Sequence, residues 1–324
     1  MATSQEIPEQ LQPQQDGLSF DLQSVYRSVL LLHTEASEDG YTAASLGTER
    51  LGHGVVIRSA ERKLVLTIGY LITEAESIWL TDHDGKVIEA CPLAYDQASG
   101  FGLVQPLGPL SAPALERGSA AALVVGDRVI VVGHGGAHHS LEARLIARRE
   151  FAGYWEYLLD DALFTAPPHP QWGGTALVGP QGLLLGIGSL FVQESMAQES
   201  FDANMFVPID LLEPILADMV ELGRPRRPPR PWLGVYIAEQ ADQVVVAGVT
   251  RDGPAYRAGL RRGDVILEVA GQRVFSLPQF LRRVWSSGVA GAAVPVTLAR
   301  AGESVYLTVQ SANRDDFLKK PSRH

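Results

Sequence analysis

The sequence predicts a mainly β protein built of two units. Short apolar runs broken by Gly, Asp and Ser recur over the first two thirds of the chain, and few helical stretches separate them. The 32 Gly and 20 Pro residues suit a fold with many turns. With 46% hydrophobic and 20% charged residues, the 324-residue chain can bury real cores. This pattern favours an all-β barrel or sandwich for the first unit.

Six apolar runs supply candidate strands of the first unit, after an N-terminal segment that we expect to be disordered. Residues 1–19 are rich in Gln and polar, and the ordered part begins with the run at 24–33. The six runs lie at residues 54–57, 64–67, 77–80, 123–132, 176–178 and 183–187.

The pattern changes at Pro208. Over 208–222 the apolar residues recur at helical spacing, and Gly223 is a candidate helix end. The basic, proline-rich run 223–231 predicts an extended linker, interpreted as a solvated spacer. A second unit with strands and a helix near 277–285 spans 232–311. The polar tail, 312–324, is expected to fray.

Composition limits the partners and the location. The net charge of −10 disfavours nucleic acid, whose phosphates require a basic surface. Residues 1–20 lack a basic start followed by an apolar core, and the nearest apolar run, 29–32, is far too short for a signal peptide. No segment approaches the ~18 apolar residues that a membrane span requires. We therefore expect no export signal, no membrane contact and a cytoplasmic location. The single cysteine, Cys91, excludes an intrachain disulfide and is expected to be a small residue in or beside a strand.

Four motifs together resemble the HtrA (Deg) family of trypsin-like serine proteases. The run GHGVVI at 52–57 looks like the family's GSGVII strand, with His53 in place of Ser, and 206–216 looks like its closing helix. The run WLGV at 232–235 looks like the opening of its PDZ domain, and GPAYRAGLRRGDVIL at 253–267 looks like GSPAAKAGLKPGDVIL. The resemblance covers roughly 24–311. It implies a trypsin-like double six-stranded β-barrel with its closing helix over 20–222, followed by a PDZ domain over 232–311.

The three catalytic positions of this family can be checked by resemblance. Ser-His-Asp catalysis needs a hydroxyl nucleophile, an imidazole base and an orienting carboxylate. The motif positions hold Tyr70 for the histidine, Gly100 for the aspartate and Gly173 for the serine. A phenol with a pKa of about 10 is a poor base at neutral pH. Asp96, four residues before Gly100, is interpreted as a turn residue.

The loop that would hold the oxyanion is also altered. Gln171 stands where the family has Gly, and we expect Trp172 to fill the substrate cleft. Thr175 replaces another Gly and should stiffen the loop.

These substitutions predict an inactive serine protease homologue, not an enzyme and without a cofactor. Such a pseudoprotease would serve as a scaffold, adaptor or structural subunit that binds protein partners through its barrel surface and PDZ groove. The resemblance also allows a homotrimer, or a subunit of a hetero-complex. The alternative is a residual or altered hydrolase, with a metal held by His134, His138 and His139, joined by His169.

The PDZ domain offers the candidate peptide site. In such domains a peptide adds as a strand to a sheet edge, and backbone N–H groups of a short loop hold its terminal carboxylate. The alternatives are that the apolar groups are only core, or that the groove docks internally. The predicted peptide-binding residues are Leu233, Gly234, Val235, Tyr236, Ile237, Phe280, Leu281 and Val284.

Overall fold

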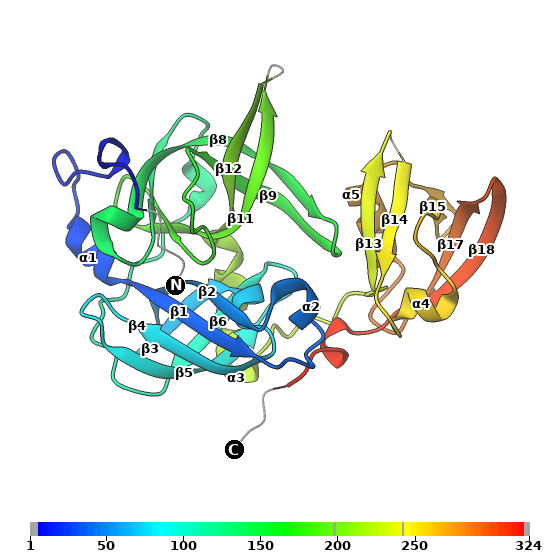
Figure 1. Cartoon of the computed structure of the whole chain (residues 1–324), viewed down its shortest axis with the longest axis horizontal. Coiled ribbons are helices and arrows are strands. Elements are labelled where there is room, and N and C mark those ends of the chain that lie inside the picture. The colour runs from blue at the N-terminus through cyan, green and yellow to red at the C-terminus, as the bar shows by residue number, and fades with distance from the viewer. Residues whose placement is uncertain (1–5, 197–198, 242, 321–324) are drawn as a thin grey trace. The chain divides into compact units, whose positions relative to one another are not determined.

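The computed structural model describes residues 6–196, 199–241 and 243–320, and the chain divides into two compact units (Figure 1). The barrel unit consists of Met1–Arg149, Asp161–Arg226 and Lys319–His324. The PDZ unit consists of Glu150–Asp160 and Arg227–Leu318. The segment 150–160 thus belongs to the second unit although it interrupts the first in sequence, which the sequence did not predict.

The first barrel closes through six antiparallel strands in the order β1-β2-β3-β6-β5-β4. Apolar side chains that alternate along each strand fill its interior, and Leu30, Leu32, Val55 and Leu66 are fully buried. The strands are β1 Val29–Ala36, β2 Glu49–Ser59, β3 Arg62–Ile68, β4 Ala75–Thr81, β5 Val87–Tyr95 and β6 Phe101–Pro106.

The second barrel closes in the order β10-β11-β12-β9-β8-β7. Its core includes Val131, Leu163, Leu177 and Phe206. The two closed barrels confirm the predicted double six-stranded architecture. The strands are β7 Arg128–Val132, β8 Ser140–Gly153, β9 Tyr157–Ala166, β10 Ala176–Val178, β11 Leu184–Met196 and β12 Glu199–Pro208.

Helices of the barrel unit are short. The closing helix predicted over 208–222 is a 3₁₀ turn after Pro208 followed by the α-helix Glu213–Leu222, and Gly223 caps it with φ 73° and donates to the carbonyl of Met219. The α-helices are α1 Leu22–Arg27, α2 Ala43–Leu46 and α3 Glu213–Leu222. The 3₁₀ turns are η1 Glu9–Leu11, η2 Gly69–Leu71, η3 Ala120–Ala122, η4 Gly136–His139 and η5 Ile209–Leu211.

The N-terminal segment departs from the expected disorder over residues 6–19, whereas residues 1–5 lie outside the described part of the chain. Ile7 is 5% exposed and joins the core of the second barrel. Its amide donates to the carbonyl of His138 over 2.8 Å, and Gln12 Nε2 donates to the carbonyl of Ile7. Burial of one apolar side chain and these hydrogen bonds therefore order a segment whose composition is polar.

The linker and the tail also form more contacts than the sequence suggested. Arg226 pairs with Asp218 at 3.1 Å, within the barrel unit. In the PDZ unit the guanidinium of Arg230 lies 4.2 Å from the ring centre of Trp285. Phe317 packs 4.7 Å from Trp232, so residues 312–318 do not fray. Residues 321–324 lie outside the described part.

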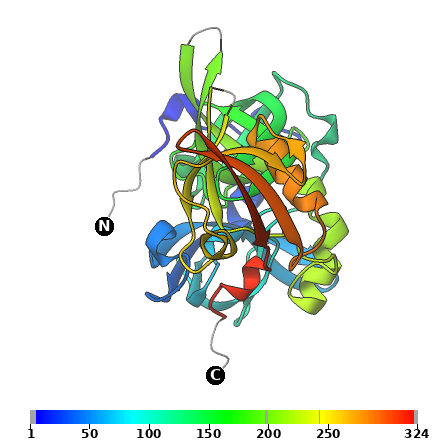
Figure 2. The ribbon, with the colours of Figure 1, turned by 90° about the vertical axis from the view of Figure 1, so that its right-hand side faces the viewer.

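The PDZ unit is one antiparallel sheet in the order β13-β14-β15-β17-β18, with β16 paired to β15, and two helices (Figure 2). Pro254 starts a short helix that the chain leaves at Gly259, and the helix predicted near 277–285 is observed over Leu277–Ser286. The strands are β13 Val235–Gln240, β14 Gln243–Val249, β15 Val265–Val269, β16 Gln272–Arg273, β17 Ala293–Arg300 and β18 Glu303–Gln310. The helices are α4 Pro254–Ala258, α5 Leu277–Ser286 and the 3₁₀ turn η6 Arg314–Asp316.

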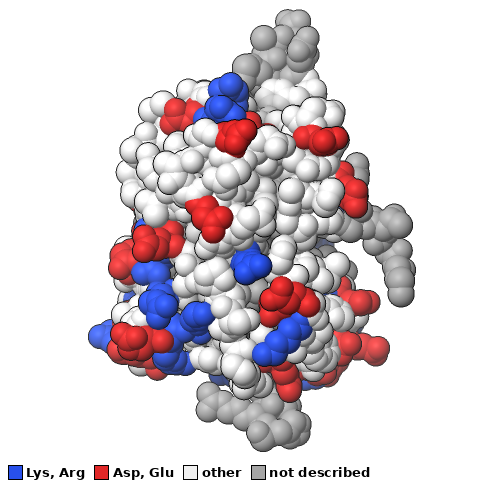
Figure 3. Space-filling model, turned by 90° about the vertical axis from the view of Figure 1, so that its left-hand side faces the viewer, with Lys and Arg blue, Asp and Glu red and all other residues white. Residues whose placement is uncertain are grey.

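Charged side chains of both signs are interspersed on the face shown in Figure 3, with basic groups lying among acidic ones. Across the described residues, none of the helices combines the length and the apolar character that a membrane crossing requires.

Candidate functional site

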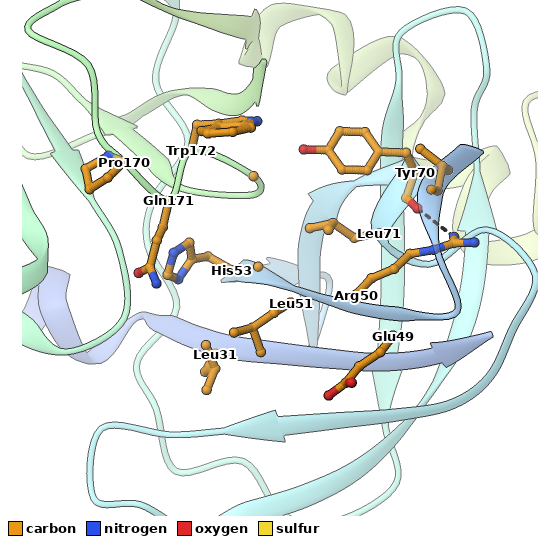
Figure 4. Close-up of a pocket in the computed structure, with 13 residues that line it drawn as sticks. Leu31, Glu49, Arg50, Leu51, His53, Tyr70, Leu71, Pro170, Gln171 and Trp172 are labelled. Carbon is orange, nitrogen blue, oxygen red and sulfur yellow. Dashed lines mark hydrogen bonds between the residues drawn. The ribbon is translucent and has the colours of Figure 1, made fainter. Parts of the chain in front are cut away.

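A cavity of about 370 Å³ lies between the two barrels, within the barrel unit (Figure 4). Residues of β1, β2 and η2 line it from the first barrel, and residues 170–173 line it from the second. The lining residues are Leu31, Leu46, Glu49, Arg50, Leu51, Gly52, His53, Tyr70, Leu71, Pro170, Gln171, Trp172 and Gly173.

Tyr70 stands at the predicted histidine position, in η2 directly after β3. Its hydroxyl donates to the carbonyl of Ser189 over 2.9 Å, and Arg50 Nη1 donates to the Tyr70 carbonyl over 2.8 Å. Burial raises the pKa of the Tyr70 hydroxyl far above its ordinary value near 10. The phenol is therefore a fixed, neutral hydrogen-bond donor.

Gly173, at the predicted serine position, lies directly against Tyr70. A Cβ atom built on Gly173 would come within 2.8 Å of the Tyr70 hydroxyl oxygen. The Gly173 carbonyl accepts from the amide of His53 over 2.8 Å, which ties this loop to β2. The structure thus brings the predicted base and nucleophile positions together, with the phenol filling the space where a residue-173 side chain would project.

Gly100, at the predicted aspartate position, reaches Tyr70 only through the backbone. Its carbonyl accepts from the amide of Gly69 over 2.7 Å. Asp96 caps the preceding turn, because its carboxylate accepts from the amide and the hydroxyl of Ser99 at 3.0 and 2.7 Å. Asp96 is therefore a turn residue, as interpreted from the sequence.

The loop 170–175 shapes the wall of the cavity. Trp172 points toward Tyr70 across the cavity and packs 5.4 Å from Phe191 (Figure 4). Thr175 donates from its hydroxyl to the Trp172 carbonyl over 2.8 Å and holds the loop. Trp172 lines the cavity, and whether its indole blocks a substrate stays a prediction.

The histidine-rich loop does not assemble the metal site considered from the sequence. His134 Nε2 lies 3.0 Å from the carbonyl of Asp82, and His169 Nε2 lies 3.0 Å from the carbonyl of His139. Within the described ranges, His, Cys, Asp and Glu side chains nowhere gather in a group of three suited to a metal ion. The imidazoles of His134 and His169 are thus placed by separate local contacts, and His138 accepts from the amide of Ile7 through its backbone carbonyl.

His53 is a functional candidate that the sequence noted only as a replacement for serine. Its side chain is 1% exposed, its Nδ1 accepts from the amide of His134 over 3.0 Å, and its ring meets that of His169 edge-on at 6.1 Å. Burial, followed by the neighbouring histidines, lowers the pKa of His53 to about 3. His53 is therefore a neutral imidazole in the cavity wall, and its Nε2 lacks a hydrogen-bond partner among the described residues.

The predicted carboxylate-binding loop of the PDZ unit does hold a carboxylate, and it is that of Glu156. The amides of Leu233, Gly234 and Val235 donate to the Glu156 carboxylate at 2.9, 2.7 and 3.0 Å. Gly234 has φ 74°, a backbone conformation that turns its N–H toward this acceptor and that side chains other than Gly rarely adopt.

The segment 150–160 also covers the predicted groove. The Tyr154 carbonyl accepts from the amide of Ile237 over 3.0 Å, and Tyr236 lies 6.2 Å from the Tyr154 ring. Leu158 is 7% exposed and belongs to the same apolar cluster as the groove residues. Sequence reasoning missed this segment. The groove residues that are buried in this cluster are Leu233, Val235, Ile237, Phe280, Leu281 and Val284.

Two family models match the chain: a trypsin-like peptidase domain over residues 52–187 and a PDZ domain over 231–310. The periplasmic serine endoprotease DegP of Escherichia coli K12 is 23% identical over 275 residues, covering 80% of this chain and 56% of DegP. The serine endoprotease DegS of Haemophilus influenzae is 24% identical and covers 82% of this chain and 77% of DegS. The chain thus spans little more than half of DegP.

Solved structures share the fold. The HtrA-type protease AlgW with a decapeptide matches with a TM-score of 0.54 and 22% identity, covering 93% of this chain and 98% of AlgW. The serine endoprotease from Yersinia pestis matches with a TM-score of 0.54 and 21% identity, over 91% of this chain and 98% of the other.

The prediction that the chain is not an enzyme is contradicted by these comparisons, because the relatives and structural neighbours are named serine endoproteases. It rested on Tyr70, Gly100 and Gly173, and a catalytic set is recognised by geometry and roles, not by sequence position. The residues at three motif positions therefore do not demonstrate inactivity. The double barrel and both family matches show a trypsin-like peptidase domain followed by a PDZ domain, an arrangement similar to that of the HtrA-type proteases.

Proposed function

We propose that this HtrA-type chain binds the C-terminal ends of protein partners through its PDZ unit, and that this binding underlies an adaptor or scaffold role. One observation carries the proposal. Three consecutive backbone amides, at 233–235, converge on a single carboxylate at hydrogen-bond distance. A protein C-terminus presents the same group, and PDZ domains capture it in this way. One structural neighbour, AlgW, was solved with a decapeptide.

The test is fluorescence polarisation with the full chain and a library of labelled peptides that differ in their last four residues. We expect binding of peptides with a free C-terminus and an apolar last residue, because the groove residues are apolar. The same peptides with amidated ends are the control, since amidation keeps the side chains and removes the charge. Equal affinity for free and amidated peptides, or no binding at all by the chain and its variants, contradicts the proposal.

Peptide hydrolysis is a second candidate, favoured by the names of the relatives. Among the residues lining the barrel cavity, the one hydroxyl belongs to Tyr70. Cleavage of unfolded casein by the wild type that is lost in Tyr70→Phe would assign hydrolysis to this cavity. A fluorophosphonate probe that labels the wild type, followed by mapping of the labelled residue, would place the nucleophile elsewhere if it is not Tyr70.

Two further predictions concern assembly and location. A homotrimer is testable by light scattering coupled to size-exclusion chromatography, and a hetero-complex by affinity purification from the native host. The cytoplasmic location stays a prediction, to be checked by fractionation of cells that express the tagged full-length protein.

A further inference from the structure

We propose that residues 150–160 are an internal ligand of the PDZ unit, and that the partners which displace this segment are acidic C-terminal peptides with an apolar last residue. The inference rests on the proposed peptide-binding function and names both the occupant of the site and the chemistry of its competitor. Four features of the segment carry it, all within the PDZ unit.

The carboxylate of Glu156 takes the place of a terminal carboxylate. Oε1 accepts from Gly234 and Val235, and Oε2 accepts from Leu233, so both oxygens are bound. The Glu156 residue is 6% exposed. The three amides are on consecutive residues and form a cradle, and those of Leu233 and Gly234 precede β13, which begins at Val235. A peptide carboxylate therefore cannot enter this cradle while Glu156 is in place.

The backbone of the segment meets the edge of the sheet where a peptide would add. The Ile237 amide, at the edge strand β13, donates to the Tyr154 carbonyl over 3.0 Å. Strand addition satisfies edge amides in this manner. The segment therefore uses the two polar contacts expected of a peptide ligand, one at the loop and one along the strand.

The side chain of Leu158 supplies the apolar component. It is 7% exposed and packs in the cluster that contains Val235, Phe280 and Leu281. These are groove positions on β13 and α5. A peptide that displaces Leu158 from the groove has to bury an equivalent apolar surface there. We therefore expect the competing peptide to end in an apolar residue.

The flank of the groove selects acidic groups. Arg282, on α5, pairs with Glu150, and also with Asp160 at 2.5 Å. Both partners lie at the two ends of the internal segment, so its departure leaves Arg282 without these two carboxylates. Arg282 is about half exposed, and the pairs contribute little to holding the segment, but an incoming Asp or Glu can replace them.

Docking is tested first by amide hydrogen exchange in the full chain, followed by NMR. In the wild type we expect the amides of Leu233, Gly234 and Val235 to be protected, and in Glu156→Ala to exchange at least about tenfold faster. Glu156→Gln keeps one acceptor oxygen and should give an intermediate rate. The matched control is Glu303→Ala, an exposed glutamate of β18. Retained protection in α5 shows that each variant is folded.

Competition is tested by fluorescence polarisation on the same proteins. Glu156→Ala should bind free C-terminal peptides at least about tenfold more tightly than the wild type or Glu303→Ala. In the Glu156→Ala background, peptides with Asp or Glu before an apolar last residue should bind several-fold more tightly than the matching Lys peptides. Adding Arg282→Gln should remove that preference.

The outcomes separate the two proposals. Fast exchange at 233–235 in the wild type, unchanged in Glu156→Ala, overturns internal docking whatever the peptides do. Carboxylate-dependent binding that is equal in the wild type and Glu156→Ala upholds peptide recognition and overturns the internal ligand. Exchange that depends on Glu156, with no peptide bound by any variant, supports the internal contact but overturns both peptide recognition and the role of peptides as competitors.

Discussion

The cavity between the barrels and the carboxylate loop of the PDZ unit are each filled in part by a side chain of the chain itself, in contrasting ways. Tyr70 is anchored at both ends, since its hydroxyl donates to Ser189 and its carbonyl accepts from Arg50. Glu156 is held at the loop through its carboxylate, which extends from a turn with positive φ. The first arrangement is integral to the packing of the barrel unit, whereas the second can be exchanged for a ligand that carries the same group.

The glycines of the two regions show the same contrast. Around the cavity they permit contact between backbones, as at Gly174, where an added Cβ would lie 1.9 Å from the carbonyl oxygen of His53. In the PDZ loop, Gly234 orients an amide toward an acceptor, and an added Cβ would meet only side chains, at 3.1 Å or more. Tight backbone packing at the cavity leaves little freedom to rearrange, and the predictions below test that difference.

The largest effect is expected for Gly174→Ala. The substitution adds a Cβ at φ 79° and forces it against the His53 carbonyl, so strain and overpacking add. We expect the barrel unit to lose roughly 2–5 kcal/mol of unfolding free energy. Calorimetry of the full chain measures this loss of unfolding free energy. The unfolding transition of the barrel unit is identified as the one that shifts in variants of that unit.

Gly126→Ala is the matched control. It also introduces a Cβ at positive φ, at 100°, but with open space around it. It should cost only about 1–2 kcal/mol. Equal losses for the two variants would show that close packing against β2 contributes nothing and would weaken the contrast drawn between the two regions.

A smaller effect is expected from the contact of Gly173 with Tyr70. Gly173→Ala should cost about 1–3 kcal/mol, because its Cβ would meet the phenol oxygen at 2.8 Å and the phenol is held by Ser189. Tyr70→Phe removes that oxygen and should cost about 1 kcal/mol through the lost hydrogen bond.

The double variant decides whether the two positions are coupled. With Tyr70→Phe in place, Gly173→Ala should cost about 1 kcal/mol less than in the wild type, measured as a double-mutant cycle in the barrel transition. Strict additivity would show that the phenol does not restrict the side chain at position 173.

Much of the fold could be predicted because its signals are local. Alternating apolar residues mark the strands, and the run 253–267 marks a helix followed by a strand within fifteen residues. The end of α3 at Gly223 is likewise readable from neighbouring residues. The ordered structure of residues 6–19 could not be predicted, because it depends on Ile7 packing in the core of the second barrel. The other buried residues of that core lie more than a hundred positions from Ile7 in the sequence.

The candidate site divides in the same way. The loop 233–235 could be identified because its pattern is local, whereas Glu156 lies 78 residues from Gly234 in the sequence and sits in a turn without periodicity. The left-handed backbone conformation of Glu156 could not be predicted either, because Glu is not a typical residue for that conformation. The approach of Tyr70 to Gly173 required the two barrels to be placed against one another.

The smallest effect is expected from pH. Burial raises the pKa of Glu156 to about 7, and outweighs the hydrogen bonds from Leu233, Val235 and Gly234 and the charge of Arg314, which favour the carboxylate. An undocked Glu titrates near 4.3. The docked form therefore binds a proton more tightly than the undocked form, so docking is strongest at low pH and weakens as pH rises toward about 7.

Between pH 6.5 and 8 the docking equilibrium should therefore weaken by roughly fourfold. Exchange rates of the amides at 233–235, corrected for the intrinsic pH dependence of exchange, measure this change in the full chain. Glu156→Gln removes the ionisable side chain at position 156 and should show a flat profile after the same correction. A wild-type profile as flat as that of Glu156→Gln would mean that the docked carboxylate is already ionised at pH 6.5, so that the three amides and Arg314 outweigh the cost of burial. In that case the internal contact would resemble a bound peptide terminus even more closely, since the loop would hold a full negative charge across the whole range.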